Sequence, residues 1–220
     1  MRLYGYFRSS ASWRVRIALN LKGLQADLVP RHLRRGEQRD PGYLALNPQG
    51  LVPALLPEDG PAHDGPAHDG PVLTQSLAII EWLEEHYPEP ALLPSDPGRR
   101  ARVRAFALAI ACDIHPIQNL KVLARLRHLG VAEEDVGGWA KWVIEEGFAA
   151  LETMIADEPG PFAFGDAPTL ADVCLVPQFG NARRFGVDVE RFPRLLAAER
   201  AALELPAFTA ALPEEQPDAE

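Results

Sequence analysis

Cysteine is scarce in this sequence. The two cysteines, Cys112 and Cys174, lie far apart in apolar surroundings, and neither belongs to a Cys-x-x-Cys pair. A disulfide scaffold or a structural zinc site needs several clustered cysteines. The sequence therefore predicts no disulfide framework and no metal centre, and two isolated thiols suit a reducing compartment.

Long apolar runs are also missing. No stretch reaches the roughly 18 apolar residues that a membrane crossing needs. Residues 1–6 lack the apolar core of a secretory signal peptide. We therefore expect a cytoplasmic protein that has no membrane partner.

The chain has no overall excess of positive charge. Its net charge of −9 over 220 residues argues against nucleic acid as a partner. The charge is uneven, because residues 1–39 hold nine Lys or Arg and only two acids, a local excess of +7. This region would attract a small anion, or it is a solvated basic face balanced elsewhere, and composition favours neither interpretation.

The first part of the chain alternates strand and helix patterns. Turn residues and proline separate short apolar runs from segments with helical periodicity. The order predicts a βαβ unit followed by a ββα unit, which together build a mixed sheet with helices. The expected elements are strands at 3–7, 26–33, 53–56 and 72–74 and helices at 13–21 and 77–87.

The remainder reads as almost entirely helical after a proline-rich linker at 88–97. One long helix is expected over 99–129, with a kink at Pro116 because proline lacks the amide donor. Thr169 and Asp172 have capping-box spacing, which assigns Asp172 to structure. Further helices are expected at 139–155, from Thr169 to about 185 and from 192 onward, and residues 213–220 read as a disordered acidic tail.

The hairpin tip between the strands at 53–56 and 72–74 contains a tandem repeat, PAHDG, at 61–65 and 66–70. His63, Asp64, His68 and Asp69 could offer ligands to a metal. A loop insertion that the hairpin tolerates is the preferred interpretation, because loop tips accept added length at little cost.

The turn before the first helix is rich in hydroxyls, and Ser9 and Ser10 precede the apolar run that begins at Trp13. A helix N-terminus carries partial positive charge and unpaired N–H groups, so a hydroxyl there can support an anion such as a thiolate. The two cysteines lie elsewhere, so such a thiolate would come from a ligand. The alternative is that Ser9 simply caps the helix.

Five stretches in this order resemble the zeta class of glutathione transferases, the family of maleylacetoacetate and maleylpyruvate isomerases. The resemblance implies an α/β thioredoxin-like domain at 1–87 that binds glutathione. It also implies an all-helical substrate-site domain at 94–220, and a homodimer. The stretches are Ser9–Leu19, Leu46–Pro53, Gln75–Ser76 with Ile79–Leu83, Asp113–Leu120 and Thr169–Asp172.

The same resemblance implies roles for individual residues. Ser9 would support the glutathione thiolate, with Ser10 assisting, and Gln38 would hold the glycyl end. The Val52 backbone, turned by a cis Pro53, would meet the cysteinyl part. The γ-glutamyl carboxylate would be held by Gln75 and Ser76.

Further roles implied by the resemblance fall in both domains. His115 and Asn119 would line the site from the helical domain, although His115 could instead be a helix-kink residue satisfied by backbone. The substrate carboxylates would be bound by Arg8 and Arg184. Arginine suits this task better than lysine, because its guanidinium can bind a carboxylate through two hydrogen bonds. Lys121 is as consistent with a solvated helix face as with a carboxylate contact. One departure is Ala11, which stands where the family usually has cysteine.

The function implied is glutathione-dependent isomerisation of a maleyl dicarboxylate to its fumaryl isomer. Thiolate addition to the cis double bond, rotation and expulsion of the thiolate would accomplish this. The first expectation is maleylacetoacetate, from aromatic amino-acid breakdown. Maleylpyruvate isomerisation in gentisate breakdown, general glutathione conjugation and non-catalytic glutathione binding are the alternatives.

Overall fold

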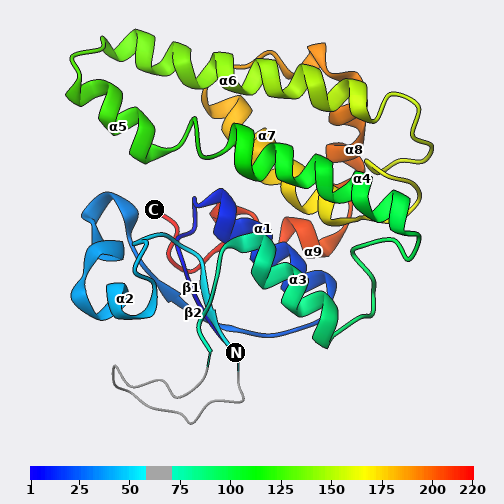
Figure 1. The fold of residues 1–220 in the computed structure, drawn as a ribbon, viewed down its shortest axis with the longest axis horizontal. Helices are drawn as coiled ribbons and strands as arrows, with labels where there is room; N and C mark the ends of the chain where they lie inside the picture. Colours follow the sequence, from blue (N-terminus) through cyan, green and yellow to red (C-terminus); the bar gives the residue numbers. More distant parts are fainter. Residues whose placement is uncertain (58–70) are drawn as a thin grey trace. The chain divides into compact units, whose positions relative to one another are not determined.

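The computed structural model describes residues 1–57 and 71–220. The PAHDG repeat, with its four candidate metal ligands, lies outside the described residues. The chain forms two compact units: Met1–Pro90 together with Pro206–Glu220, and Ala91–Leu205 (Figure 1). The first unit is α/β and the second is helical, as the sequence patterns predict.

The sheet of the first unit has four strands in the order β2-β1-β3-β4. The β1 strand runs parallel to β2 and antiparallel to β3, and β3 and β4 form an antiparallel hairpin. Leu3 pairs with both Leu28 and Leu55. The predicted βαβ and ββα order is confirmed, with strands β1 (Arg2–Gly5), β2 (Asp27–Pro30), β3 (Ala54–Leu56) and β4 (Leu73–Thr74).

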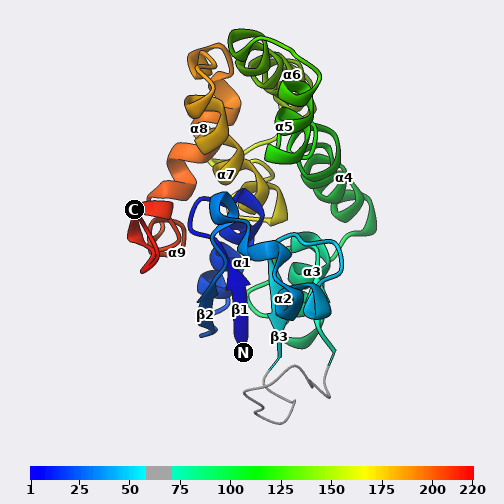
Figure 2. The same cartoon turned by 90° about the vertical axis from the view of Figure 1, so that its left-hand side faces the viewer.

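Helices cover both faces of this sheet. Figures 1 and 2 show α1 and α3 together on one face and α2 on the other. Their bounds are α1 (Ser10–Leu21), α2 (Pro41–Leu46), α3 (Ser76–His86) and α9 (Pro206–Thr209), with short 3₁₀ turns η1 (Leu33–Arg35), η2 (Glu37–Arg39) and η5 (Pro213–Glu215).

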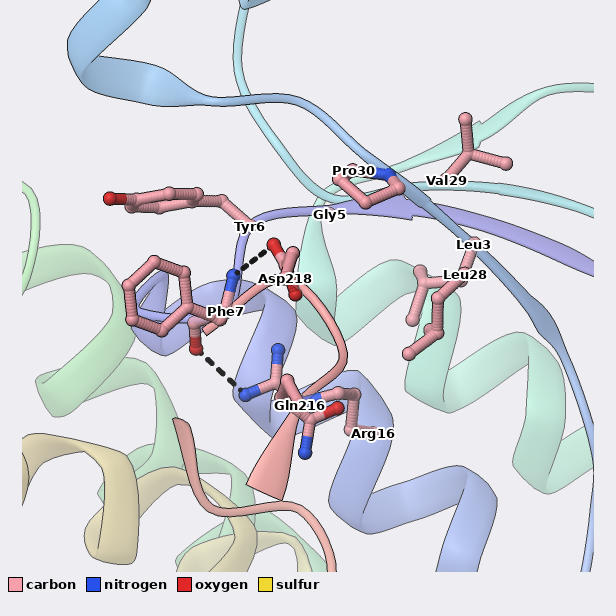
Figure 3. A pocket seen from close by; sticks show the side chains of 10 residues that line it. All are labelled: Leu3, Gly5, Tyr6, Phe7, Arg16, Leu28, Val29, Pro30, Gln216 and Asp218. Atoms are coloured by element: carbon pink, nitrogen blue, oxygen red, sulfur yellow. Dashed lines mark hydrogen bonds between the residues drawn. The ribbon is translucent and has the colours of Figure 1, made fainter. Parts of the chain in front are cut away.

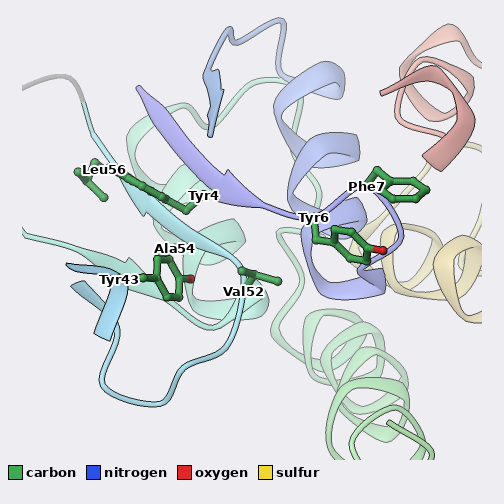
Figure 4. Close-up of a cluster of buried hydrophobic side chains, with 7 residues drawn as sticks. All are labelled: Tyr4, Tyr6, Phe7, Tyr43, Val52, Ala54 and Leu56. Atoms are coloured by element: carbon green, nitrogen blue, oxygen red, sulfur yellow. The ribbon is translucent and has the colours of Figure 1, made fainter. Parts of the chain in front are cut away.

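The core of this unit follows from the two-residue period of the strands. Successive residues of a strand point to opposite faces. Tyr4, Ala54 and Leu56 therefore share a face, and Figure 4 shows Tyr43 of α2 turned toward them. At the C-terminal end of α1, the buried Lys22 connects this helix to the end of α3. Its ammonium donates to the Glu84 carboxylate and the Tyr87 carbonyl, both at 2.7 Å.

The second unit is a helical bundle packed around buried phenylalanines. Phe148 lies with its ring centroid 5.0 Å from that of Phe179 and 5.5 Å from that of Phe192, joining three segments that are distant in sequence. The helices are α4 (Pro97–Leu108), η3 (Ala109–Ile114), α5 (Leu120–His128), α6 (Glu133–Met154), α7 (Leu170–Arg184), η4 (Val189–Arg191) and α8 (Pro193–Leu203).

The prediction of one long helix over 99–129 is wrong. The segment is divided into α4, a π-helical turn η3 and α5, and the chain turns through residues 115–119. Pro116 has no amide to continue the helix, and Asn119 starts a new one by accepting a hydrogen bond from the Leu120 N–H at 2.7 Å. Pro116 indicated where the helix would be disturbed, but the sequence did not show that it would be interrupted over several residues.

The C-terminal residues also differ from expectation. Residues 213–220 were expected to be disordered, but η5 forms there and the Gln216 side chain is buried. Pro206–Glu220 belongs to the first unit, whereas the predicted helical domain at 94–220 included it. The remaining domain bounds stay predictions.

The described residues contain neither a candidate membrane-spanning helix nor a candidate metal-binding cluster. Of the helices there, none combines the length and the apolar composition that a membrane crossing needs. Within residues 1–57 and 71–220, no three or more His, Cys, Asp or Glu side chains gather in a way that could hold a metal ion.

Candidate active site

The start of α1 holds the hydroxyl-rich turn. Ser9 is the N-cap residue, and its Oγ accepts a hydrogen bond from the Ser12 N–H at 3.2 Å. A hydroxyl that accepts one hydrogen bond still has its own proton to donate. Ser9 is half-buried and Ser10 is buried. Capping and support of an anion are therefore compatible at Ser9 and do not exclude one another.

The start of α3 is more open. Gln75 is the N-cap residue, with a φ of 67°, but its side chain makes no capping hydrogen bond. Its amide Nε2 donates instead to Gln49 Oε1 at 2.8 Å. Among the described residues, no side-chain hydrogen bond caps the first turn of this 11-residue helix, and its first N–H groups carry the positive end of the helix dipole. Such a helix start suits a carboxylate.

Two loops approach closely beside these helix starts. Gly50 has a φ of +61°, and a Cβ there would lie 3.2 Å from the Gln38 carbonyl oxygen, so glycine permits the contact. The Gln38 Oε1 atom is buried and has no hydrogen-bond partner among the described residues. An unpaired buried amide oxygen is costly. It can be satisfied if a ligand supplies a donor.

The segment before β3 presents backbone groups. The Val52–Pro53 peptide bond is cis, as the resemblance implied. The Val52 side chain is buried, and within the described part of the chain neither its N–H nor its C=O forms a hydrogen bond. Tyr43 Oη and Asn47 Nδ2 both donate to the Leu51 carbonyl, at 2.6 and 2.7 Å, and fix the chain just before it. Burial raises the pKa of Tyr43 to about 12, so its phenol stays a donor at neutral pH.

Arg14 links the two helix starts and was not singled out from the sequence. Its side chain is 1% exposed, and Nη1 donates to the Ser76 Oγ at 3.4 Å. A guanidinium beneath the first turn of α3 adds positive charge where the helix dipole already attracts an anion. The sequence did offer a signal for Arg14, because it lies inside the apolar run Trp13–Leu19. An arginine buried in such a run needs a hydrogen-bond or charge partner.

Three predicted site residues belong to the second unit. His115 is half-buried and its N–H donates to the Ile110 carbonyl at 2.9 Å. Asn119 caps α5. Arg184 is exposed, with its guanidinium carbon 5.4 Å from the Phe185 ring centroid. Their action on a ligand held by the first unit stays a prediction.

Contacts link the segments that carry six predicted residues of the first unit. Contacts run from Gln38 to Gly50, from Gln49 to Gln75, and from Ser76 through Arg14 to α1. Arg8, exposed, directly precedes the Ser9 turn. This first-unit set consists of Ser9, Ser10, Gln38, Val52, Gln75 and Ser76.

Comparison with known families is decisive. The model for "Glutathione S-transferase, N-terminal domain" matches residues 8–86, and the model for "Glutathione S-transferase, C-terminal domain" matches residues 123–200. The chain belongs to the glutathione S-transferase family. The predicted fold class, an α/β thioredoxin-like domain followed by a helical domain, is confirmed by this match.

Relatives of this glutathione S-transferase place it in the zeta class. The maleylacetoacetate isomerase of Pseudomonas aeruginosa is 50% identical over 220 residues, which cover 99% of this chain and 98% of that protein. A maleylpyruvate isomerase from a Ralstonia species is 48% identical and covers 99% of both. The maleylacetoacetate isomerase of Mus musculus is 44% identical, over 98% of this chain and 94% of that protein.

Solved structures of similar proteins agree with this assignment. A zeta-class maleylpyruvate isomerase superposes with a TM-score of 0.92 at 47% identity, over the whole of both chains. The maleylacetoacetate isomerase of Methylobacterium extorquens AM1, with bound malonate and glutathione, gives 0.92 at 39% identity, also over both whole chains. That of Anaeromyxobacter dehalogenans 2CP-1, with bound dicarboxyethyl glutathione and citrate, gives 0.85 at 46%, over 100% of this chain and 97% of that chain.

Proposed function

We propose that this zeta-class glutathione S-transferase binds glutathione along the starts of α1 and α3 and isomerises a maleyl dicarboxylate to its fumaryl form. The observation that carries the proposal is the pair of helix N-termini joined by Arg14, one holding the Ser9 hydroxyl and the other left without a side-chain cap. A thiolate and a carboxylate are the anions that these two ends suit.

The residues present fit glutathione. Its γ-glutamyl carboxylate would accept hydrogen bonds at the start of α3 from Ser76 and the first-turn N–H groups, with Gln75 beside it. The N–H and C=O of Val52, which form no hydrogen bond within residues 1–57 and 71–220, would pair with the cysteinyl backbone, as a strand edge pairs with an extended peptide. The buried Gln38 Oε1, which lacks a partner among the described residues, would accept from an N–H donor near the glycyl end.

Ser9 would act at the thiolate. When bound, glutathione supplies a thiolate whose reversible addition to the cis double bond allows rotation about it. Ser9 would donate a hydrogen bond from its hydroxyl to the sulfur while its oxygen continues to cap α1, and the helix dipole would favour the negative charge. Ser10, buried at the first position of α1, supports this turn. Ala11 removes the family cysteine and leaves the serine chemistry intact.

Substrate carboxylates would be bound by arginine. Arg8 lies at the Ser9 turn, is exposed, and can form bidentate contacts with a carboxylate. Arg184 is proposed as the second clamp, and His115 and Asn119 as lining residues. Cationic donors near the conjugated carbonyl would also stabilise the negative charge that develops there.

Maleylacetoacetate and maleylpyruvate both fit the proposal. Relatives named for either activity are 50% and 48% identical to this chain, a difference too small to choose between them. General glutathione conjugation would use the same Ser9 chemistry. A non-catalytic binding protein would need the Ser9 hydroxyl only to cap α1. We further propose a cytoplasmic homodimer, the arrangement that the family resemblance implies.

The test is to supply the purified protein with each cis substrate, with and without glutathione, and follow its loss by absorbance. Glutathione-dependent turnover supports the isomerase, and the faster substrate identifies the reaction. If glutathione binds but neither substrate turns over, conjugation or binding is the remaining function. If glutathione does not bind, the proposed site is wrong.

The carboxylate clamp has a separate test. Arg8→Ala should lower kcat/KM for the dicarboxylate by at least ~10-fold, the value of one charge-assisted contact. Activity toward a neutral thiol acceptor should change much less. Arg200→Ala, an exposed arginine of α8, is the matched control. Equal losses with both electrophiles would rule out the clamp.

A further inference from the structure

The C-terminal segment Pro206–Glu220 has a defined shape within the first unit. Its α9 helix packs against α1, and Asn20 Nδ2 donates to the Ala207 carbonyl at 3.0 Å. The buried Gln216 side chain donates to the carbonyls of Ala210 and Leu212, at 3.0 and 2.8 Å. These contacts hold the last residues against the sheet, beside the pocket shown in Figure 3.

This segment holds the backbone N–H of Phe7, two residues before Ser9, and Arg16 of α1 holds the Phe7 carbonyl. The Phe7 N–H donates to Asp218 Oδ2 at 3.0 Å, and the Phe7 carbonyl accepts from Arg16 Nη2 at 2.9 Å, both drawn in Figure 3. The same Arg16 donates to the Ala211 carbonyl at 3.0 Å. Burial lowers the pKa of Arg16 to about 10, so it remains a cation at neutral pH. The peptide before Phe7 is therefore bonded directly to the C-terminal segment, and the peptide after it is linked to that segment through Arg16.

The geometry continues from Phe7 into the candidate catalytic turn. The Ser9 N–H donates to the Tyr6 carbonyl at 2.9 Å, and the Trp13 N–H donates to the Ser9 carbonyl at 2.8 Å. The position of Ser9 therefore depends on how residues 6 and 7 are held. The last residue contributes less, because the exposed Glu220 pairs with Arg35 at 2.9 Å, and exposed ion pairs stabilise little.

We propose that Asp218 is a positioning residue, which fixes the Phe7 peptide and through it the direction of the Ser9 hydroxyl. This role rests on the proposed function. A catalytic group must be held to within a fraction of an ångström, and a displacement of about 1 Å can cost roughly 10²-fold in rate. The glutathione contacts at Val52, Gln75 and Ser76 do not pass through Phe7. Loss of the Asp218 contact should therefore affect turnover more than glutathione binding.

The experiment compares Asp218→Ala with Asp218→Asn, whose amide oxygen can still accept from the Phe7 N–H. Glu214→Ala is the matched control, an exposed acid on the same segment. Amide hydrogen exchange at Phe7 reports the contact without any ligand. The kcat, the KM for glutathione and the thiol pKa of bound glutathione, followed by thiolate absorbance, report its consequence.

Asp218→Ala should speed exchange at Phe7 and lower kcat, each by about 10-fold, the value of one hydrogen bond to a charged group. It should raise the thiol pKa of bound glutathione and leave the KM within about twofold. Asp218→Asn and Glu214→Ala should resemble the wild type in all four readouts.

Several results would overturn the proposal. One is unchanged Phe7 exchange in Asp218→Ala, and another is faster exchange with unchanged kcat and thiol pKa. A third is equal loss in Asp218→Asn, since that variant keeps the hydrogen bond. Failure of the proposed function is recognised separately, because the unsubstituted protein would then show no glutathione-dependent turnover, and the positioning role would fall with it.

Discussion

Three helix starts in this protein differ in how their side chains use the first-turn N–H groups. At α7, Thr169 and Asp172 form a closed capping box, in which the Asp172 carboxylate accepts from the N–H groups of Ala163 and Thr169, both at 2.8 Å. At α1, Ser9 satisfies one N–H and keeps its hydroxyl proton, and at α3 no side chain caps the helix.

The difference separates structure from chemistry. Asp172 is 0% exposed and both of its oxygens are occupied by hydrogen bonds within the chain. Ser9 is half-buried. A helix start whose donors are all used internally stabilises the fold, whereas one with unused donors can bind an anion. Substitutions at the two kinds of start should therefore affect different measurements.

The largest effect is expected at Ser9. Ser9→Ala should lower kcat for the preferred cis substrate by ~10²- to 10³-fold, since it removes the proposed hydrogen-bond donor to the thiolate and loss of one donor to an anion in an active site has about that cost. The lost cap should cost only about 1 kcal/mol of unfolding free energy. Ser9→Thr, which keeps a hydroxyl, is the control and should retain much of the activity. Similar kcat values for the alanine variant and the wild type would assign Ser9 to capping alone.

Asp172→Ala should have the opposite effect to Ser9→Ala, with a large loss of stability and no change in kcat. It leaves two N–H groups without their carboxylate acceptor, of which the Ala163 N–H is buried, and should lower the free energy of unfolding by about 4 kcal/mol. Urea denaturation measures the loss. The kcat per folded molecule should not change. A stability loss under about 1 kcal/mol would mean that the box contributes little.

The pH dependence of stability should distinguish the closed start as well. Burial raises the pKa of Asp172 to about 6, from 3.8, despite its hydrogen bonds. The folded state therefore holds this proton more tightly than the unfolded state. The resulting stabilisation is fully present below pH 4 and is lost as the pH rises through about 6.

The measurement is the difference in unfolding free energy between the wild type and Asp172→Asn, which cannot titrate. As the pH rises from 4 to 6, the unfolding free energy of the wild type should fall by at most about 3 kcal/mol relative to that of Asp172→Asn. Above pH 6 the difference between the two proteins should stay constant. A difference that is constant from pH 4 to 7 would contradict the raised pKa.

The smallest effect is expected at α3. Ser76→Ala removes one donor from the proposed carboxylate site and should weaken glutathione binding about 10-fold, or about 1.4 kcal/mol. The kcat at saturating glutathione should stay within about twofold, because the proposed thiolate position is at the start of α1. Thr153→Ala, an exposed hydroxyl of α6, serves as the control in calorimetric titration. If kcat falls as much as affinity, the two helix starts do not have separate tasks.

Local sequence signals predicted the features that depend on nearby residues. The Ser9 turn, the Thr169–Asp172 box and the hairpin at β3–β4 were located correctly, because caps and turns are formed within a few residues. The long helix over 99–129 was wrong, since periodicity does not show how far a proline break will propagate. Arg14 was missed for a related reason, because its Ser76 partner is 62 residues away.

The sequence by itself determined the family, the order of strands and helices, and the residue types at each helix start. Only the tertiary structure decided that Gln75 bonds to Gln49 and, among the described residues, leaves the start of α3 without a side-chain cap hydrogen bond. It also decided that Pro206–Glu220 returns to the first unit, where Asp218 meets the Phe7 N–H across 211 residues. The physical reason is that a hydrogen bond between segments distant in sequence forms only after both segments are packed together. No local sequence pattern therefore predicts it.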